Sequence, residues 1–372
     1  MKINTNTKLR FHWMLPKGGE VKINKIQTPK EAARYRLDAP RNSSPANSPD
    51  MEGWQYFARK AEEAGIDSLL ISFSCFEPDP VVVACALGGV TKKLKYIVAF
   101  RSGLMQPPAF VQQINTLSGL IDGRVLLNTV AGSSIKEQRS YGDFLDHDQR
   151  YDRAGDFLSV CNALWKNKNE VDFSGKHYQI SKGKVFTPFK SSDRKTPEIF
   201  VSGHSEAARQ LAVSQGTCWL RVIDTPEKLA PTVAKVRAQG IEVCLRLCII
   251  CRPTREEAIS VINEILENTN SDEKDINLPV RNDSQMYREA AKSSKGIWLN
   301  DNIWAGFTPH FGPVWTTLVG TPEQIVNAFM EYKKIGVSQF IISGWPELNE
   351  LDIFGQEVLP AFRAAEKKIM VM

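Results

Sequence analysis

The sequence predicts a (β/α)8 barrel, the TIM-barrel class, and three observations support that fold. Short β-branched runs alternate with segments of helical period, which is typical of parallel-sheet α/β proteins. Eight such runs can be counted, and eight is the number of strands that closes this barrel. The 372 residues exceed the roughly 250 of a bare barrel, so we expect one barrel domain over residues 1–372 with insertions.

The expected strands are short apolar runs that end at glycine, proline or polar residues. They lie at residues 10–15, 68–72, 94–101, 124–131, 198–201, 217–221, 242–251 and 339–343. In the first helix, 51–64, Trp54, Phe57 and Ala61 share one face, and Gly65 closes the helix. The other helices are expected at residues 81–87, 109–120, 151–165, 206–213, 226–239, 255–266 and 323–332, with a last one near 352–364.

Three long stretches do not fit the barrel repeat and are expected as insertions, near residues 17–50, 166–196 and 268–321. The pattern FSGKHYQI in the second predicts a small hairpin off the main body. The first and third are long enough to form a lid or a subunit contact. A doubly wound sheet is the alternative fold, but the GxGxxG, GxxxxGK[ST] and HExxH motifs are absent.

Composition excludes several classes of protein. The net charge of +5 comes from 47 basic and 42 acidic residues spread along the chain, which does not suit a nucleic-acid-binding surface. No window approaches the roughly 18 apolar residues of a membrane helix, and the first residues lack the apolar core of a secretory signal. The seven cysteines lie mostly in apolar runs, so we expect a reduced, cytoplasmic protein.

A barrel places its chemistry at the carboxyl ends of its strands. The segment VSGHSEAA combines a strand end, a small polar turn and a helix start, so Ser202, Gly203, His204 and Ser205 could cradle an anion. A serine at that position is equally an ordinary helix N-cap.

A second helix start lies in LDHDQRYDRAGDF, where His147 and Tyr151 are four residues apart and could reach one ligand. A capped helix with a solvent-facing histidine is the alternative interpretation.

The strand at 242–251 carries a charge in an apolar run. Alternation puts Arg246 and Cys248 on one face, and a buried guanidinium needs an anionic partner, either a carboxylate or a ligand. His12 and Trp13 close the first strand, and Cys75 follows the second. No set of residues has metal-ligand spacing. The chemistry is therefore expected to come from a cofactor.

From about Phe11 to Pro360 the chain resembles the bacterial-luciferase-like flavin monooxygenases, and within them the alkanesulfonate monooxygenase group. The segments that carry the resemblance are FHWMLP, LKYIVAFRSGLMQPPAFVQQINTLSGLIDGRVLLNTVAGS, FLDHDQRYDRAGDF, VDFSGKHY, IFVSGHSEAARQLA, NIWAGF, TLVGTPEQI and IISGWPELNE.

The resemblance implies a cofactor and partners. Reduced FMN would come from a separate NAD(P)H-dependent flavin reductase and react with O2 to a flavin C4a-(hydro)peroxide, which transfers one oxygen atom to a small organic substrate. Relatives pair through barrel-side helices, so a homodimer or homotetramer is expected. The flavin ring and ribityl chain would lie beside Asn128, Ala131 and Gly132. The flavin phosphate would lie near His147, Tyr151, Ser202, Gly203, His204 and Ser205.

The departures from the alkanesulfonate pattern concern the substrate. Cys75 and Arg246 match that group, but Cys248 replaces a histidine, Phe311 an arginine and Trp345 a tyrosine. Losing two groups that hold a sulfonate predicts a neutral substrate such as a sulfone or a ketone.

The resulting site consists of a catalytic set, Arg246, Cys75, Cys248 and Trp345, and a substrate pocket with His12, Trp13 and Phe311. Anion binding restored by Arg101 or His310 is the alternative. Three other activities stay open: a deazaflavin- or flavin-dependent dehydrogenase, an alkanesulfonate monooxygenase proper, and a flavin-binding relative without catalysis.

Overall fold

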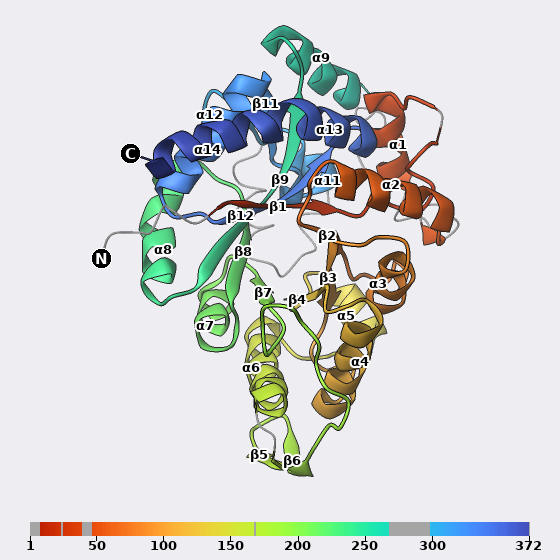
Figure 1. Cartoon of the computed structure of the whole chain (residues 1–372), viewed down its shortest axis with the longest axis vertical. Helices are drawn as coiled ribbons and strands as arrows, with labels where there is room; N and C mark the ends of the chain where they lie inside the picture. Colours follow the sequence, from red (N-terminus) through yellow and green to blue (C-terminus); the bar gives the residue numbers. More distant parts are fainter. Residues whose placement is uncertain (1–7, 24, 39–46, 167–168, 268–297, 372) are drawn as a thin grey trace.

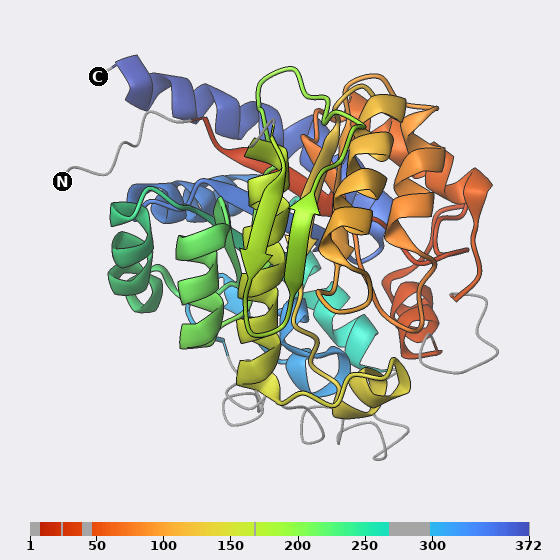
Figure 2. The same ribbon diagram turned by 90° about the horizontal axis from the view of Figure 1, so that it is seen from below.

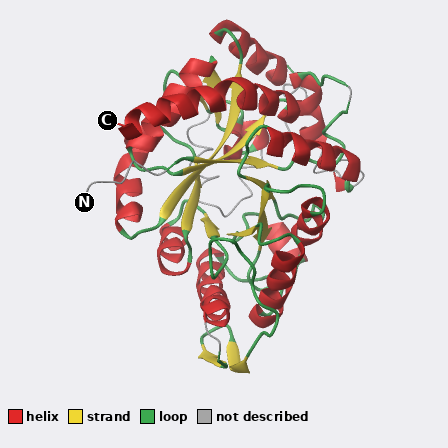
Figure 3. Cartoon of the chain, in the orientation of Figure 1, coloured by secondary structure: helices red, strands yellow, loops and turns green. Residues whose placement is uncertain are grey.

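The computed structural model describes residues 8–23, 25–38, 47–166, 169–267 and 298–371. Eight parallel strands form a closed ring surrounded by helices (Figure 1, Figure 3). The strands are β1 (Arg10–Met14), β2 (Ser68–Ile71), β3 (Lys95–Phe100), β4 (Val125–Thr129), β7 (Ile199–Ser202), β8 (Cys218–Val222), β9 (Glu242–Cys251) and β12 (Gln339–Gly344). Pairing of β12 with β1 and of β9 with both β8 and β12 closes the ring, which confirms the predicted barrel.

Helices follow the strands as predicted, with shifted ends. The barrel helices are α2 (Met51–Glu63), α3 (Pro80–Gly88), α4 (Pro107–Leu120), α6 (His147–Lys166), α7 (Glu206–Gln215), α8 (Pro226–Ala238), α9 (Arg255–Leu266) and α12 (Pro322–Lys334). Helix α6 begins four residues before the expected position, so His147 lies in its first turn. The last helix is longer than predicted and consists of α13 (Glu347–Ile353), a π-helical segment (Phe354–Val358) and α14 (Leu359–Val371).

The insertions contain both expected and unexpected elements. Strands β5 (Val171–Ser174) and β6 (Gln179–Gly183) form the predicted hairpin, which projects beyond α6 (Figure 1). Helix α1 (Pro29–Asp38) and the short helix α5 (Ile135–Ser140) were not predicted. Residues 268–297 of the third insertion lie outside the described residues.

The remainder of the third insertion joins the sheet. It contains β10 (Ile303–Trp304), α11 (Thr308–Phe311), a 3-10 turn (Pro313–Trp315) and β11 (Thr317–Gly320). Strand β11 pairs in parallel with the last four residues of β9. This part is therefore a wall of the barrel mouth, which sequence reasoning missed because β11 is only four residues long.

Side chains alternate between the inside of the barrel and the helix layer. Large aromatic residues such as Phe11 and Trp219 face the helices, and Phe11 contacts four other phenylalanine rings. The interior holds a separate group: Leu70, Ile97, Leu126, Phe200, Cys218, Leu220, Cys244 and Ile341. These side chains fill the interior. A ligand would therefore bind at one of the two ends of the barrel.

A network of ion pairs and hydrogen bonds closes the amino-terminal end of the barrel. Arg10 pairs with Glu198 at 2.5 Å and with Glu242 at 2.6 Å. The Gln339 amide donates a 3.2 Å hydrogen bond to Glu198, and its oxygen contacts the His12 ring at 2.8 Å. These partners saturate one another, so this end serves stability.

The opposite end is formed by the loops after the strands. In Figure 2, α5 (yellow) and α1 (red) lie at this end of the barrel, and α14 (dark blue) lies at the other. None of the described helices is long and apolar enough to cross a membrane.

The closed end gives a prediction on acid stability. Burial by itself would raise the pKa of Glu198, but the hydrogen bonds and charge of Arg10 outweigh burial and lower that pKa to about 2. This carboxylate then stabilises the fold above its unfolded pKa of 4.5, and the contribution is lost as pH falls towards 2. We expect Glu198→Gln to remove about 3 kcal/mol of this pH-dependent stability, measured by urea unfolding across that range. The exposed Glu52→Gln should keep the wild-type profile, and an unchanged profile for Glu198→Gln would contradict the assignment.

Candidate active site

The turn after β7 is built as a tight cradle. Gly203 has φ +147, and a Cβ there would lie 2.3 Å from the Tyr151 hydroxyl and 2.6 Å from the Ala208 Cβ. Ser205 caps α7 by accepting a hydrogen bond from the Ala208 N–H at 3.2 Å. The Gly203 carbonyl accepts from the Trp219 indole N–H at 2.9 Å. The backbone therefore passes close to Tyr151 at the positive end of a helix.

Three elements meet at this cradle. The Ser202 hydroxyl donates to the Asn128 amide oxygen at 2.7 Å, and the Tyr151 hydroxyl donates to the Ser202 carbonyl at 3.0 Å. The rings of His147 and Tyr151 are 5.0 Å apart, and His147 Nδ1 lies 2.7 Å from Asp148. Strand β4, strand β7 and the start of α6 thus bring together residues that are distant in sequence.

His204 is turned towards the neighbouring strand. Its Nε2 accepts a hydrogen bond from the Val222 N–H at 3.0 Å. An accepting nitrogen carries no proton, so the ring is neutral in this arrangement.

The loop after β4 is tightly packed. Gly132 has φ +82, and a Cβ there would overlap the side-chain amide of Gln138. Arg150, which sequence reasoning missed, donates to the carbonyls of Ala131 and Leu145, each at 2.8 Å. The signal was present, because Arg150 lies in the first turn of α6 on the same face as Tyr151 and Ala154, and all three are buried.

Arg246 points into the barrel, on the same face of β9 as Cys248. It donates to the Ser343 hydroxyl at 2.5 Å, to the Ile341 carbonyl at 3.4 Å and to the Met14 sulfur at 3.3 Å. No carboxylate within the described ranges forms an ion pair with it, although the sequence led us to expect an anionic partner or a ligand. Burial lowers the pKa of Arg246.

The Cys248 thiol is fully buried and lies 3.7 Å from the Val314 carbonyl. Burial raises its pKa to about 12, against the opposing effects of Arg246 and Arg36. Cys248 is therefore a neutral thiol at physiological pH.

Aromatic rings form one cluster at the barrel mouth. The Trp345 ring lies 4.7 Å from Trp315, 4.9 Å from Phe311 and 5.8 Å from Phe307. Cys248 belongs to the same apolar cluster. We call Phe307, Phe311, Trp315 and Trp345 the aromatic wall. The three positions that depart from the alkanesulfonate pattern thus meet in space.

Arg36 of α1 covers this wall. Its guanidinium lies 4.1 Å from the Trp315 ring centre and 4.7 Å from that of Trp345. It also pairs with Glu20 and Glu347, each at 2.5 Å. Sequence reasoning missed Arg36 because the stretch that contains it was not assigned to a helix. The adjacent Ala32 and Ala33 on a buried face were the available signal.

Cys75 lies apart from the aromatic wall, in the exposed loop after β2. Its N–H donates to Glu137 at 2.8 Å, and Arg101 donates to the same oxygen at 2.9 Å. Burial and the charge of Glu137 raise the pKa of the Cys75 thiol. Arg101 is thus already paired, and His310, whose pKa is lowered by burial, is disposed to be neutral.

Neither His12 nor Trp13 faces the aromatic wall. His12 is hydrogen-bonded to Gln339 at 2.8 Å and to Ser68 at 2.6 Å, in the lower part of the barrel interior. Trp13 faces the helix layer, where its indole N–H donates to Glu347 at 2.6 Å. Strand alternation makes Met14 the β1 side chain that reaches Arg246.

A family model described as luciferase-like monooxygenase matches residues 34–339 of the chain. The chain belongs to the luciferase-like monooxygenase family. In this chain the residues at the strand ends form two groups, the cradle after β7 and the aromatic wall with Arg246. The part of the chain that the structure describes contains no group of three or more potential metal-ligating side chains.

Solved structures share the fold at low sequence identity. A riboflavin lyase superimposes with a TM-score of 0.73 at 22% identity, covering 96% of this chain and 92% of its own. An EDTA monooxygenase from Chelativorans sp. BNC1 gives 0.72 at 18%, covering 96% and 94%. A long-chain alkane monooxygenase gives 0.71 at 19%, covering 96% and 92%. At these identities the likeness establishes the barrel fold.

The cradle gives a prediction on stability. Gly203→Ala should destabilise the protein by about 1–3 kcal/mol more than Gly142→Ala, because only the former forces a side chain into occupied space. Gly142 is the matched control, since it has φ +78 but no atom within 4 Å of the added Cβ. The free energies of unfolding in urea give the comparison. Equal losses for the two variants would show that the cradle is looser than described.

Proposed function

We propose that this luciferase-like monooxygenase uses reduced FMN and O2 to insert one oxygen atom into a small, neutral organic substrate. The observation that carries the proposal is the convergence of Cys248, Phe311 and Trp345 on one aromatic wall beside the buried Arg246. A buried cation next to an apolar surface suits a reaction in which negative charge develops away from water.

The cradle after β7 fits a flavin phosphate. It combines a glycine that leaves no room for a Cβ, a helix start capped by Ser205, and the Tyr151 hydroxyl. Backbone N–H groups at a helix start bind phosphate oxygens without a side-chain cation. Ser202, Gly203, His204, Ser205, His147 and Tyr151 would hold the phosphate, and Asn128, Ala131 and Gly132 would hold the ring and ribityl chain.

Bound reduced flavin would supply the electrons that activate O2. Arg246 is held by neutral acceptors, so its charge remains available to stabilise negative charge in the reacting complex. Trp345 and Phe311 would exclude water and contact the substrate, with the neutral Cys248 thiol beside them. Cys75 lies beside Glu137, in the loop after β2. From there it would contact the reacting complex on the β2 side of the barrel mouth.

The charges around the mouth support a neutral substrate over an alkanesulfonate. A buried sulfonate needs several donors to replace its hydration. Glu137 offsets the charge of Arg101, although the Arg101 Nε and Nη1 have no hydrogen-bond partner within the described residues. Burial favours the neutral form of His310. Neither residue therefore adds an uncompensated positive charge.

A separate NAD(P)H-dependent flavin reductase is the proposed source of reduced FMN. A cytoplasmic setting fits the seven cysteines, which are all free.

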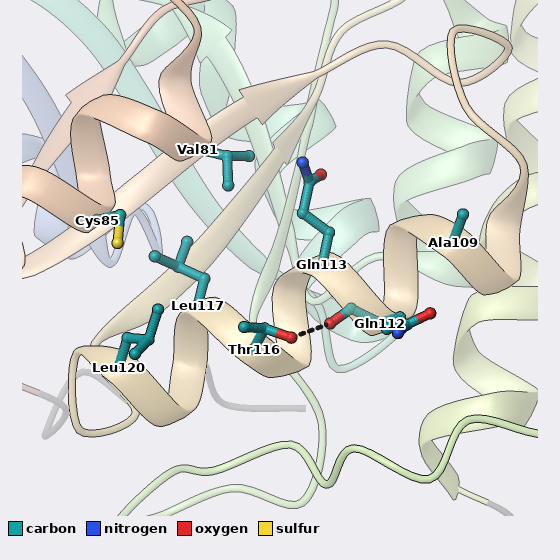
Figure 4. Close-up of a pocket in the computed structure, with 8 residues that line it drawn as sticks. All are labelled: Val81, Cys85, Ala109, Gln112, Gln113, Thr116, Leu117 and Leu120. Carbon is teal, nitrogen blue, oxygen red and sulfur yellow. Dashed lines mark hydrogen bonds between the residues drawn. The ribbon is translucent and has the colours of Figure 1, made fainter.

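A homodimer is the proposed assembly, and its contact surface is the outer face of α3 and α4. Helix α3 is apolar on all sides, yet Val82 is 66% exposed, and Leu120 at the end of α4 is 65% exposed. A groove runs between the two helices (Figure 4). It is lined by Val81, Cys85, Ala109, Gln112, Gln113, Thr116, Leu117 and Leu120. A second copy presenting the same helices would cover this surface.

The oxygenase proposal is tested with the full chain, FMN, NADH, a flavin reductase and isotopically labelled O2. We expect label from O2 in the product of a neutral sulfone or ketone, measured by mass spectrometry. Arg246→Met should lower the rate by about 10²–10³-fold, because it removes the buried cation while keeping an unbranched side chain. FMN binding, followed by fluorescence, should stay at the wild-type level. Substrate oxidation without label, or with a deazaflavin alone, would favour the dehydrogenase instead.

The dimer proposal is tested by light scattering after size exclusion. Val82→Glu combined with Leu120→Glu should convert a wild-type dimer into a monomer, because four charges would be buried at the contact. Phe186→Glu is the matched control, since Phe186 is 85% exposed but lies outside α3 and α4, and it should stay dimeric. A wild-type monomer at micromolar concentration would contradict the contact.

A further inference from the structure

Two guanidinium groups reach the aromatic wall. Arg36 lies 4.1 Å from the Trp315 ring centre, and Arg246 lies 5.9 Å from the same ring. Arg246 comes from the barrel, whereas Arg36 comes from the segment between β1 and α2. Two buried cations beside one cluster of aromatic rings would ordinarily create a site for an anion.

The charge of Arg36 is cancelled by two buried carboxylates. Glu20 accepts from Arg36 Nε at 2.6 Å, and its other oxygen accepts from the Lys17 N–H at 2.8 Å. Glu347 accepts from Arg36 Nη2 at 2.5 Å and from the Gly344 N–H at 2.6 Å. Glu20 is 1% exposed and Glu347 is 2% exposed.

The groups that contact these two carboxylates are all hydrogen-bond donors, with the Trp13 indole N–H as the third donor to Glu347. A protonated carboxyl would need an acceptor for its own proton. Burial raises the pKa of Glu347, whereas the charge of Arg36 and the hydrogen bonds from Arg36 and Trp13 favour its ionised form.

The surrounding charges also balance. Lys17 forms an ion pair with Glu77 at the edge of the same region. In this region the three cations Arg36, Arg246 and Lys17 equal in number the three carboxylates Glu20, Glu347 and Glu77, although none of these carboxylates forms an ion pair with Arg246. Without Glu20 the mouth would carry one net positive charge beside the aromatic wall.

We propose that Glu20 is a specificity-determining residue: together with Glu347 it offsets the charges of Arg36 and Arg246, and so makes the aromatic wall select neutral substrates against anionic ones. This inference rests on the proposed function only in taking the aromatic wall as the substrate surface. Glu20 acts through Arg36 and is a positioning residue. Rejection of a wrong ligand by a built-in carboxylate is a common source of specificity.

The test uses two probes of nearly the same shape, benzenesulfonate and methyl phenyl sulfone, which differ in charge. Binding to the full chain is measured by isothermal titration calorimetry, without turnover. We expect the wild-type protein to bind the sulfone more tightly than the sulfonate. Glu20→Gln should tighten sulfonate binding by about tenfold or more, because it leaves Arg36 and Arg246 with Glu347 as their single buried carboxylate, and leave sulfone binding unchanged.

Two further variants identify the cause. Glu31→Gln removes an exposed carboxylate from the same helix as Arg36, where it pairs with Lys25, and should change neither affinity. Adding Arg36→Gln to Glu20→Gln should abolish the gain, because it removes the excess positive charge.

The inference is overturned if the wild-type protein binds sulfonate as tightly as sulfone, a result that stands even if Glu20→Gln fails to fold. It is also overturned if a folded Glu20→Gln gains no sulfonate affinity. Sulfone binding without any oxygenation would instead count against the proposed function alone. Oxygenation of neutral substrates combined with equal binding of both probes would count against this inference alone.

Discussion

Strand β9 hydrogen-bonds with β8 along its first half, with β12 over its middle and with β11 at its end. This triple pairing fixes the positions of Arg246 and Cys248 because both lie in the stretch where the partners change. It brings Ser343 opposite Cys248. Trp345, the residue directly after β12, therefore lies near Cys248 at the carboxyl end of the barrel. It also draws the turn before β11 inward, which places Trp315 over Arg246. The aromatic wall therefore depends on a strand that is longer than a barrel requires.

The two ends of the barrel use charge in different ways. At the amino-terminal end, Arg10 pairs with two glutamates, of which Glu198 is buried and Glu242 is partly exposed. At the carboxyl end, Arg246 is left with neutral acceptors, while Arg36 is saturated by carboxylates. A buried guanidinium without a counter-ion costs free energy. Under the proposed function, negative charge that develops in the reaction would offset this cost.

Much of the fold could be predicted from the sequence, since buried parallel strands are continuous apolar runs with recognisable ends. All eight barrel strands were found in this way. Helix α1 and strand β11 were not, because α1 lies in a polar stretch and β11 is too short to show a period. Their places are set by contacts with distant parts of the chain, such as α1 against α9.

Only part of the candidate site could be predicted from the sequence. The resemblance to a family singled out Cys248, Phe311 and Trp345, and the structure brings them together. Nothing local to Arg36 indicates that it stacks on tryptophans near the other end of the sequence. The orientation of Trp13 was also hidden, since a strand end alone does not tell which face of the barrel a side chain takes.

The position of Arg36 and Glu20 outside the barrel proper has a wider meaning for the chain. Both belong to the segment that links the first strand to its helix, whereas the aromatic rings and Arg246 belong to the barrel mouth. Under the proposed role of Glu20, ligand charge preference and barrel integrity are encoded in different stretches of sequence. A chain built in this way can exchange its connecting segment and acquire a new ligand preference while the scaffold beneath stays the same.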